Sequence, residues 1–276
     1  TCVAIRRWLV LFVLFVGSAS TEVYTGLGVG SARGLEGTVF DRPGRGYTAR
    51  LPGARGAWNP RGESPQEQAA LLQKAADKLG VESPIVLGHS FGGAVALAWG
   101  VQRPKDTAAL VLVSAVSEPW PGGLGWIYNL SASRLGGALF VPTVTAFVPD
   151  SVVQSSIESI FAPQPAPDGY ADHIGTGLTL RRSASRANAQ QVHQLRPHVV
   201  EMATQYDRLT MPVEIIHGDA DPIVPMHIPA EELIHDIPNG TLPRSPGLGH
   251  IPQPPPPPDS NEAHDPTPPP ARVWFT

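Results

Sequence analysis

A serine in a glycine-rich turn constrains the fold of this chain more than any other feature. Residues 88–92 read GHSFG, with Ser90 at the centre, and they follow the apolar run 85–87 (IVL) and precede the run 93–98 (GAVALA). This order predicts a strand, a sharp turn and a helix, with glycines where side chains would collide with the neighbouring strand and helix. Such a turn lifts a serine hydroxyl above the strand ends and directs the next backbone amide at a bound carbonyl oxygen.

Strand and helix patterns alternate on both sides of this turn. Ser64 and Glu67 form a capping box with Pro65 at the first helical position, and apolar residues recur at helical spacing until Gly80. Further strands are expected at residues 38–40, 108–114, 213–217 and 240–242, and a further helix at 231–237. The alternation predicts an α/β fold with a doubly wound, mostly parallel sheet, whose core comprises residues 38–115 and 197–252.

The segment between the two halves of this core has a different pattern. Residues 116–196 contain turns, short helical stretches and several aromatic residues, and they predict an inserted helical cap. Trp120, Trp126 and Tyr128 would line an apolar substrate pocket. The alternative is that these aromatic side chains only pack the cap onto the core.

The N-terminal region permits two interpretations. Two arginines precede the apolar run 8–16, and residues 17–20 are small, so that residues 1–20 are similar to an export signal or a short membrane anchor. In that case the protein would be exported or membrane-associated. The alternative is a buried strand, because Val, Phe and Leu dominate the run. Residues 21–37 are rich in glycine and are expected to be a connector.

Composition excludes several other functions. The net charge is only −4 and no basic stripe is present, which argues against nucleic acid as a partner. Cys2 is the single cysteine, so a disulfide framework and a cysteine-based zinc site are excluded. The histidine spacing predicts neither a metal site nor a cofactor. Many of the 31 prolines crowd into residues 253–276, which we expect to form a disordered tail.

The nucleophilic chemistry of a serine requires a base and an acid. A histidine must accept the hydroxyl proton, and a carboxylate must hold the histidine ring in the correct tautomer. His250 and Asp221 follow later strands, in the chain order expected when all three groups lie at the carboxyl ends of parallel strands. Asp219 and Glu118 are rivals of Asp221 for the acid.

Two other histidines near these segments are expected to be inert. His89 neighbours Ser90 but should point away from it, and His217 closes a buried strand and should be a packed core residue.

These motifs together resemble the α/β-hydrolase superfamily. The resemblance covers roughly residues 38–252 and rests on 39–47 (VFDRPGRGY), 88–93 (GHSFGG), 217–225 (HGDADPIVP) and 249–250 (GH). It implies Ser90 as nucleophile, His250 as base, Asp221 as acid and the Phe91 amide as an oxyanion donor. The expected function is hydrolysis of a small or medium apolar carboxylic ester. Lactonases, carbon–carbon bond hydrolases and cofactor-free haloperoxidases share the same pattern.

Two departures from the family pattern suggest an alternative. The N-terminal strands, and the His-Gly loop that supplies the second oxyanion amide, are not evident before Asp41. The family's helix after the catalytic histidine is replaced here by prolines. The alternative is therefore a catalytically impaired or silent member. The absence of one oxyanion donor typically costs roughly 100- to 1000-fold in turnover.

Overall fold

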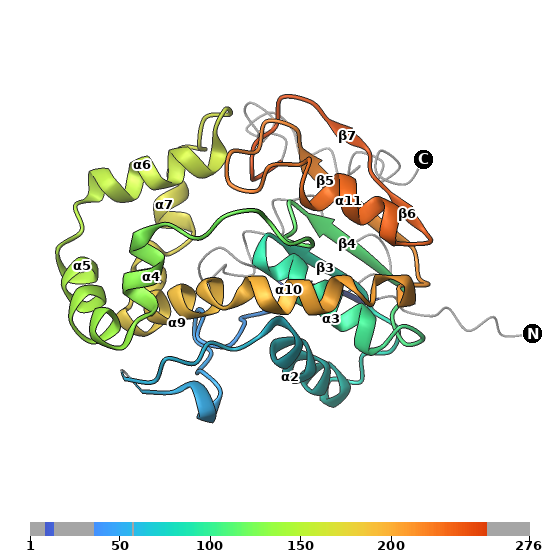
Figure 1. Ribbon diagram of the computed structural model, residues 1–276, viewed down its shortest axis with the longest axis horizontal. Coiled ribbons are helices and arrows are strands. Elements are labelled where there is room, and N and C mark those ends of the chain that lie inside the picture. The colour runs from blue at the N-terminus through green and yellow to red at the C-terminus, as the bar shows by residue number, and fades with distance from the viewer. Residues whose placement is uncertain (1–8, 14–35, 57, 253–276) are drawn as a thin grey trace, which may run out of the picture.

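A parallel sheet organises the molecule (Figure 1). The computed structural model describes residues 9–13, 36–56 and 58–252. Six strands follow the order β2-β1-β3-β4-β5-β6, and β7 pairs with β5, with every pair parallel. The strands are β1 (Leu9–Val13), β2 (Glu36–Phe40), β3 (Ile85–His89), β4 (Ala109–Val113), β5 (Val213–Gly218), β6 (Gly240–Thr241) and β7 (Arg244–Ser245). Because the strands are parallel, all their carboxyl ends meet at one edge of the sheet.

Strand β1 belongs to the N-terminal apolar run for which the sequence permitted two interpretations. It pairs with β2 on one side, from Leu9↔Glu36 to Val13↔Phe40, and with β3 on the other. For residues 9–13 the structure therefore contains the strand alternative, and the expectation that the N-terminal strands are missing is wrong at β1. The rest of residues 1–20 and most of the glycine-rich segment 21–37 lie outside the described residues. Export or membrane association through residues 8–16 stays a prediction.

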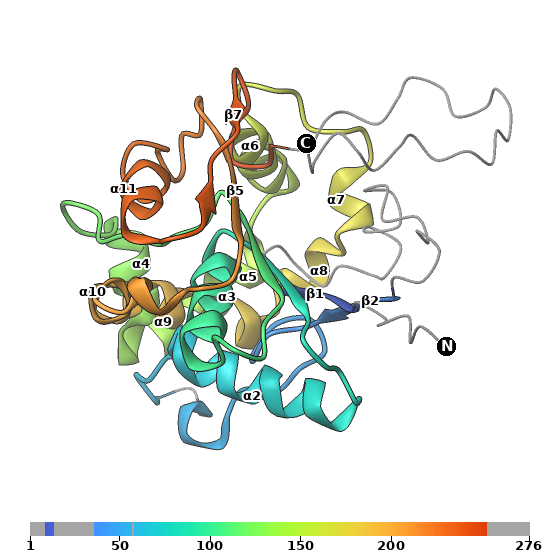
Figure 2. The same ribbon diagram turned by 90° about the vertical axis from the view of Figure 1, so that its right-hand side faces the viewer.

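Four helices lie on one side of the strands: α2 (Pro65–Lys78), α3 (Phe91–Gln102), α10 (Leu195–Ala203) and α11 (Pro229–Asp236) (Figure 2). The capping box predicted for α2 is confirmed. The Ser64 hydroxyl accepts from the Glu67 amide at 3.1 Å, and the Glu67 carboxylate accepts from the Ser64 amide at 3.0 Å. Such a cap is typically worth about 1 kcal/mol.

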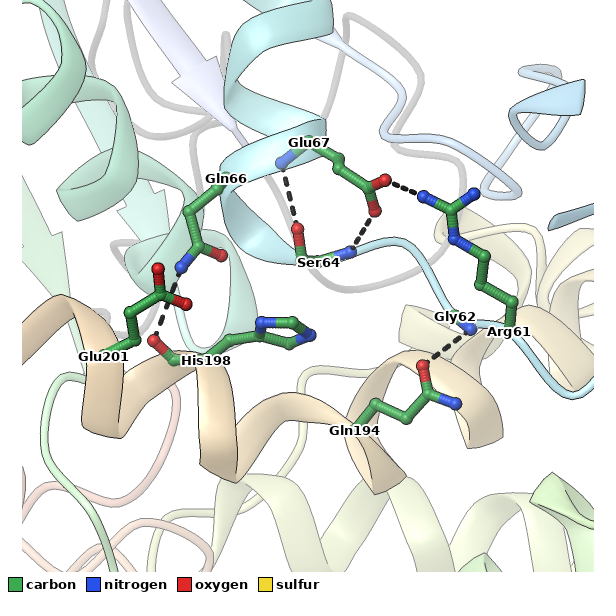
Figure 3. Close-up of a pocket in the computed structure, with 8 residues that line it drawn as sticks. All are labelled: Arg61, Gly62, Ser64, Gln66, Glu67, Gln194, His198 and Glu201. Carbon is green, nitrogen blue, oxygen red and sulfur yellow. Dashed lines mark hydrogen bonds and ion pairs between the residues drawn. The ribbon is translucent and has the colours of Figure 1, made fainter. Parts of the chain in front are cut away.

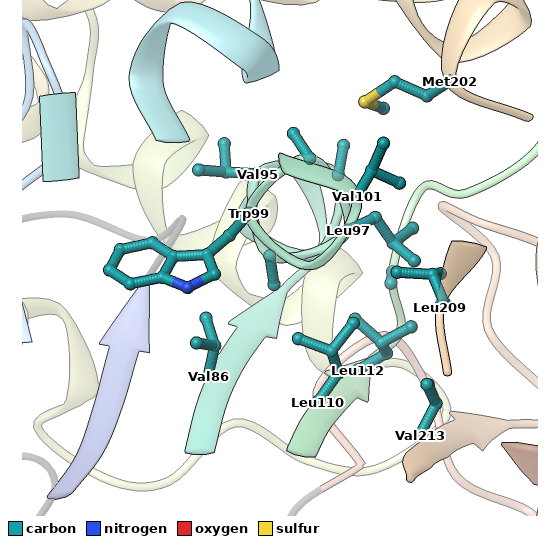
Figure 4. Packing of buried hydrophobic residues seen from close by; sticks show 14 of the residues in the cluster. Val86, Val95, Leu97, Trp99, Val101, Leu110, Leu112, Met202, Leu209 and Val213 are labelled. Carbon is teal, nitrogen blue, oxygen red and sulfur yellow. The ribbon is translucent and has the colours of Figure 1, made fainter. Parts of the chain in front are cut away.

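Helix α3 lies at the centre of the core. Its residues from Phe91 to Val101 are all buried, so it is apolar on every face rather than on one stripe. Figure 4 shows Val86 of β3 and Leu110 and Leu112 of β4 beneath it, and Met202 of α10 on its outer side. Each fully buried side chain of this size contributes roughly 1.5–3 kcal/mol to stability. The helix that begins at the serine turn is thus held rigidly on the sheet.

The segment between β4 and α10 is helical, as predicted for residues 116–196. It lies to the left of the strands in Figure 1. Its elements are α4 (Trp126–Ala132), η2 (Gly136–Phe140), α5 (Val141–Phe147), α6 (Asp150–Phe161), α7 (Tyr170–His173), α8 (Thr176–Thr179) and α9 (Arg182–His193). Two short 3₁₀ helices, η1 (Pro52–Ala54) and η3 (Tyr206–Arg208), lie elsewhere in the chain.

Several large apolar side chains of this helical segment face outward, among them Leu139 and Phe147. Within the described residues, no single helix has the length and apolar character needed to cross a membrane. The stretches Gly136–Phe147 and Asp150–Phe161 meet the length and composition criteria only as a pair, with a 98° bend between them. The proline-rich tail predicted for 253–276 lies outside the described residues.

Candidate active site at the carboxyl edge of the sheet

Ser90 occupies the strained turn between β3 and α3. Its φ is +54°, in the left-handed region that a residue with a side chain rarely adopts. Backbone hydrogen bonds hold this conformation: the Ser90 amide donates to the Val113 carbonyl at 2.9 Å, and the Ser90 carbonyl accepts from the Gly93 amide at 2.9 Å. The serine therefore lies at the carboxyl end of the sheet and at the start of a helix.

Two glycines make the turn possible. A Cβ atom at Gly88 would overlap the carbonyl oxygen of Gly92, and a Cβ atom at Gly93 would overlap the Cβ of Ala115. A side chain at Gly88 would push β3 away from α3, and a side chain at Gly93 would push α3 away from the loop after β4. The steric reason that the sequence suggested for the glycines is confirmed at both positions.

Asp221 lies in the loop after β5, where four donors surround its carboxylate. Oδ1 accepts from the amides of Ile223 and Val224, at 2.8 and 2.9 Å. Oδ2 accepts from Nδ1 of His250 at 2.8 Å and faces Nε2 of His217 at 3.4 Å. Burial alone would raise the pKa of Asp221, but the hydrogen bonds from His217 and His250 lower it below its usual range. This carboxylate is therefore ionised.

His250 is buried in a loop that packs closely on two neighbours. A Cβ atom at Gly218 would overlap the Leu248 carbonyl, so β5 and this loop approach each other at a glycine. The Gly249 amide donates to Oε1 of Gln164 at 2.6 Å, which links the loop to the segment after α6. Ile251 packs in a small apolar cluster that includes Phe161 of α6. The imidazole is thus held from both the sheet and the helical segment.

His89 and His217 belong to this site, although the sequence suggested that neither takes part. Nε2 of His89 donates to the backbone carbonyl of His250 at 2.8 Å, and the two rings are 4.9 Å apart. Burial and the neighbouring His250 lower the pKa of His89 to about 4, so this ring is neutral at pH 7. The contact brings the base loop against the residue that precedes Ser90. His217 is buried, as predicted, but its ring faces Asp221.

The two rivals of Asp221 lie elsewhere. Asp219 accepts from the Gly247 amide at 2.7 Å and so joins the acid loop to the base loop. Glu118 is buried in the loop after β4, where burial and then the charges of Asp236 and Glu232 raise its pKa to about 8. Nδ1 of His250 donates to Asp221 and to neither rival.

Phe91, the expected oxyanion donor, is the first residue of α3. Its amide lies at a helix N-terminus, where the helix dipole favours negative charge. Its ring lies under the guanidinium of Arg42, 4.5 Å from the ring centre, so the turn after β2 contacts the start of α3. The residues that follow β1, where a second oxyanion donor would be expected, lie outside the described residues.

The three predicted pocket residues occupy different environments. Trp120 packs partly buried against the core, whereas Trp126 is 67% exposed and contacts the ring of Phe140. Tyr128 is also exposed. Their role in a substrate pocket stays a prediction.

One cavity of about 440 Å³ lies between α2 and α10, and none of Ser90, Asp221 and His250 lines it (Figure 3). Its walls are polar, with Arg61, Glu67 and His198 among them.

Comparison with known proteins identifies the family and the fold of the chain. Residues 31–251 match the family model described as serine aminopeptidase, S33. The chain is 30% identical over 203 residues to a pimeloyl-[acyl-carrier protein] methyl ester esterase of Aromatoleum aromaticum, covering 66% of this chain and 73% of that protein. It is 31% identical over 190 residues to the polyketide synthase ThaQ of Burkholderia thailandensis, covering 66% of this chain but only 8% of that protein.

A solved structure shares the fold. The α/β hydrolase fold protein of Burkholderia ambifaria superposes with a TM-score of 0.67 at 22% identity, covering 89% of this chain and 86% of that one. The family match extends over most of the chain, and the order of the parallel strands and the serine turn fit the same assignment. The chain therefore belongs to the α/β-hydrolase superfamily, and its enzyme class is hydrolase.

Proposed function

We propose that this chain is a serine hydrolase that cleaves small or medium apolar carboxylic esters through an acyl-enzyme. The observation that carries the proposal is the 2.8 Å hydrogen bond between Asp221 and Nδ1 of His250. This pair lies at the sheet edge that also carries the strained turn of Ser90, and His89 joins the two parts. Nucleophile, base and acid then come from three different strand ends, as the chemistry requires.

The hydrogen bond assigns a role to each ring nitrogen of His250. Because Nδ1 donates to the Asp221 carboxylate, Nε2 of the neutral ring is unprotonated and can accept a proton. It would take the proton of the Ser90 hydroxyl while Oγ attacks the ester carbonyl. The carboxylate of Asp221 would stabilise the resulting imidazolium, and the Phe91 amide would donate to the oxyanion.

The second half of the reaction regenerates the serine. His250 returns its proton to the leaving alcohol as the tetrahedral intermediate collapses, which leaves an ester between Ser90 and the acyl group. A water molecule, deprotonated by His250, then attacks that ester, and collapse releases the carboxylic acid and restores the Ser90 hydroxyl.

Similarity to a relative supports an ester as the substrate. The Aromatoleum aromaticum protein is named for hydrolysis of a methyl ester, and its similarity covers two thirds of this chain. A pocket lined by Trp120, Trp126 and Tyr128, which the sequence predicts, would favour an apolar acyl or alcohol group.

Labelling with a fluorophosphonate probe tests the proposal. The probe should label wild type, and Ser90→Ala should abolish labelling and reduce turnover of short aryl esters by roughly 10⁴- to 10⁶-fold. His250→Ala should reduce turnover to a similar extent, because the two residues act as a unit. Circular dichroism and thermal melts of each variant serve as the folding control.

The alternative of a catalytically silent member predicts a different result. Well-folded wild type that is neither labelled nor active on any ester would overturn the proposed function. Equal turnover by wild type and His250→Ala would remove His250 from the assignment. Turnover of lactones with none of open-chain esters would redirect the assignment to a lactonase.

A further inference from the structure

His217 makes two contacts at the acid side of the site. Its Nε2 lies 2.7 Å from the carbonyl oxygen of Val224 and 3.4 Å from Oδ2 of Asp221. The residue is the fifth of β5, and no part of it is exposed. The ring therefore lies between the strand and the loop that carries the catalytic carboxylate.

The partners determine the tautomer of this ring. A carbonyl oxygen can only accept, so the proton must be on Nε2 of His217. The other nitrogen, Nδ1, is buried and has no hydrogen-bond partner in the part of the chain that the structure describes. An N–H at that position would be a buried donor without an acceptor, which is costly, so the neutral Nε2–H form is favoured.

This N–H faces the same oxygen that holds the base. Oδ2 of Asp221 accepts from His250 at 2.8 Å, and the His217 N–H is the second donor directed at that oxygen. Together with the two backbone amides on Oδ1, four donors surround the carboxylate, which is about its full capacity. Every donor directed at Oδ2 reduces the negative charge that His250 experiences.

We propose that His217 is a positioning residue: its Nε2–H bridges the Val224 carbonyl and Oδ2 of Asp221, and so sets the orientation and basicity of the carboxylate that holds His250. The inference rests on the proposed function, because it assigns Asp221 and His250 to the reaction. In the described part of the chain, the charged or titratable groups that face this carboxylate are His217 from β5, His250 from its loop and His89 from β3.

Removing the donor has a directional consequence. Without the His217 N–H, the Asp221 carboxylate becomes more basic and stabilises the imidazolium of His250 more strongly. The pKa of His250 is then raised, so the acid limb of the kcat/KM profile moves to higher pH. We expect a shift of roughly half a pH unit or more, and a kcat reduced roughly 3- to 10-fold with little change in KM.

Three substitutions separate this role from packing. His217→Gln places an amide N–H where Nε2 lies and should restore the wild-type profile. His217→Asn reaches only the position of Nδ1, and His217→Leu supplies no donor; both should show the upward shift. Because Gln and Asn are both buried amides, a difference between them reports the position of the donor rather than polarity.

Nuclear magnetic resonance of histidine-labelled full-length protein gives a readout that needs no substrate. Wild type should show His217 protonated on Nε2 and a strongly downfield Nδ1 proton from His250. The His250 signal should move in His217→Leu and His217→Asn and stay in place in His217→Gln.

The inference is overturned if wild-type His217 carries its proton on Nδ1, or if the Gln variant behaves like the Leu variant. An unchanged His250 signal in every variant would also overturn it. If Ser90→Ala retains full activity, the proposed function fails. The nuclear magnetic resonance spectra of the His217 and His250 rings test the contact between His217 and Asp221 independently of that result.

Discussion

Two loops at the same edge of the sheet each bury a carboxyl group, and the two groups behave in opposite ways. The loop after β4 carries Glu118, which is 4% exposed, and the loop after β5 carries Asp221, which is 5% exposed. Burial and two neighbouring acids raise the pKa of Glu118 to about 8. The pKa of Asp221 lies below its usual range although burial opposes this.

Hydrogen-bond donors account for the difference. Asp221 faces two backbone amides and two imidazole rings, whereas Oε1 of Glu118 has no hydrogen-bond partner among the described residues. Glu118 also faces the carboxylates of Asp236 and Glu232. Burial alone therefore does not decide whether a carboxyl is ionised at pH 7; the donors directed at it do.

The largest expected effect compares the two acids in catalysis. Asp221→Asn should reduce kcat/KM by roughly 10⁴-fold, because an amide cannot hold His250 in the required tautomer. Glu118→Gln should leave kcat/KM within about twofold of wild type, since Glu118 does not contact His250. Steady-state kinetics on one aryl ester measures both. A large loss in Glu118→Gln with a small loss in Asp221→Asn would reverse the two roles.

The pH dependence of stability should separate the same two groups. The folded state keeps Glu118 protonated between its ordinary pKa of 4.5 and about 8, so the contribution of Glu118 to stability is fully present below 4.5 and declines as pH rises toward 8. The slope can reach about 1.4 kcal/mol per pH unit. Urea unfolding at several pH values should show that Glu118→Gln lacks this decline.

The contribution of Asp221 to stability should change at the acidic end of the pH range. Because its folded pKa is lowered, its contribution to stability is present above the ordinary value and is lost as pH falls through the folded value. If the free energy of unfolding of Glu118→Gln changes between pH 5 and 8 with the same slope as that of wild type, Glu118 ionises normally in the folded protein.

A smaller effect is expected where the loop after β4 meets the serine turn. Gly93→Ala places a methyl group on the Cβ of Ala115, at the start of the loop that carries Glu118, and should lower the free energy of unfolding by about 1–3 kcal/mol. Gly123→Ala is the matched control, because no described residue beyond its two chain neighbours lies within 4 Å of its added Cβ, and it should change stability by less than about 0.5 kcal/mol. Equal destabilisation by both would contradict the steric account of the turn.

Local chemistry made part of this molecule predictable. The serine turn depends on glycines within a few residues of Ser90, and the start of α2 depends on Ser64 and Glu67, so both could be predicted from neighbouring residues. The fold class followed from the alternation of apolar runs. Residues 222–225 (PIVP), which follow Asp221 on the loop after β5, favoured Asp221 over Asp219, and Nδ1 of His250 donates to Asp221.

Contacts between distant residues could not be predicted in this way. His89 looked inert because its partner, the carbonyl of His250, lies 161 residues further along the chain. His217 looked inert because the sequence does not show how the loop after β5 turns Asp221 and Val224, four and seven residues later, back onto its ring. The raised pKa of Glu118 depends on α11, which lies more than a hundred residues further along the chain. Residues 9–13 are short and apolar, and both a strand and an export segment have that composition.

Strand β1 gives that ambiguity a physical consequence. It is hydrogen-bonded on both sides, and among the described strands β2 pairs with β1 alone. A molecule whose residues 9–13 entered a lipid bilayer or a translocation channel would present two unpaired strand edges, one on β2 and one on β3. Residence in the sheet and residence in a membrane are therefore mutually exclusive states of the same five residues.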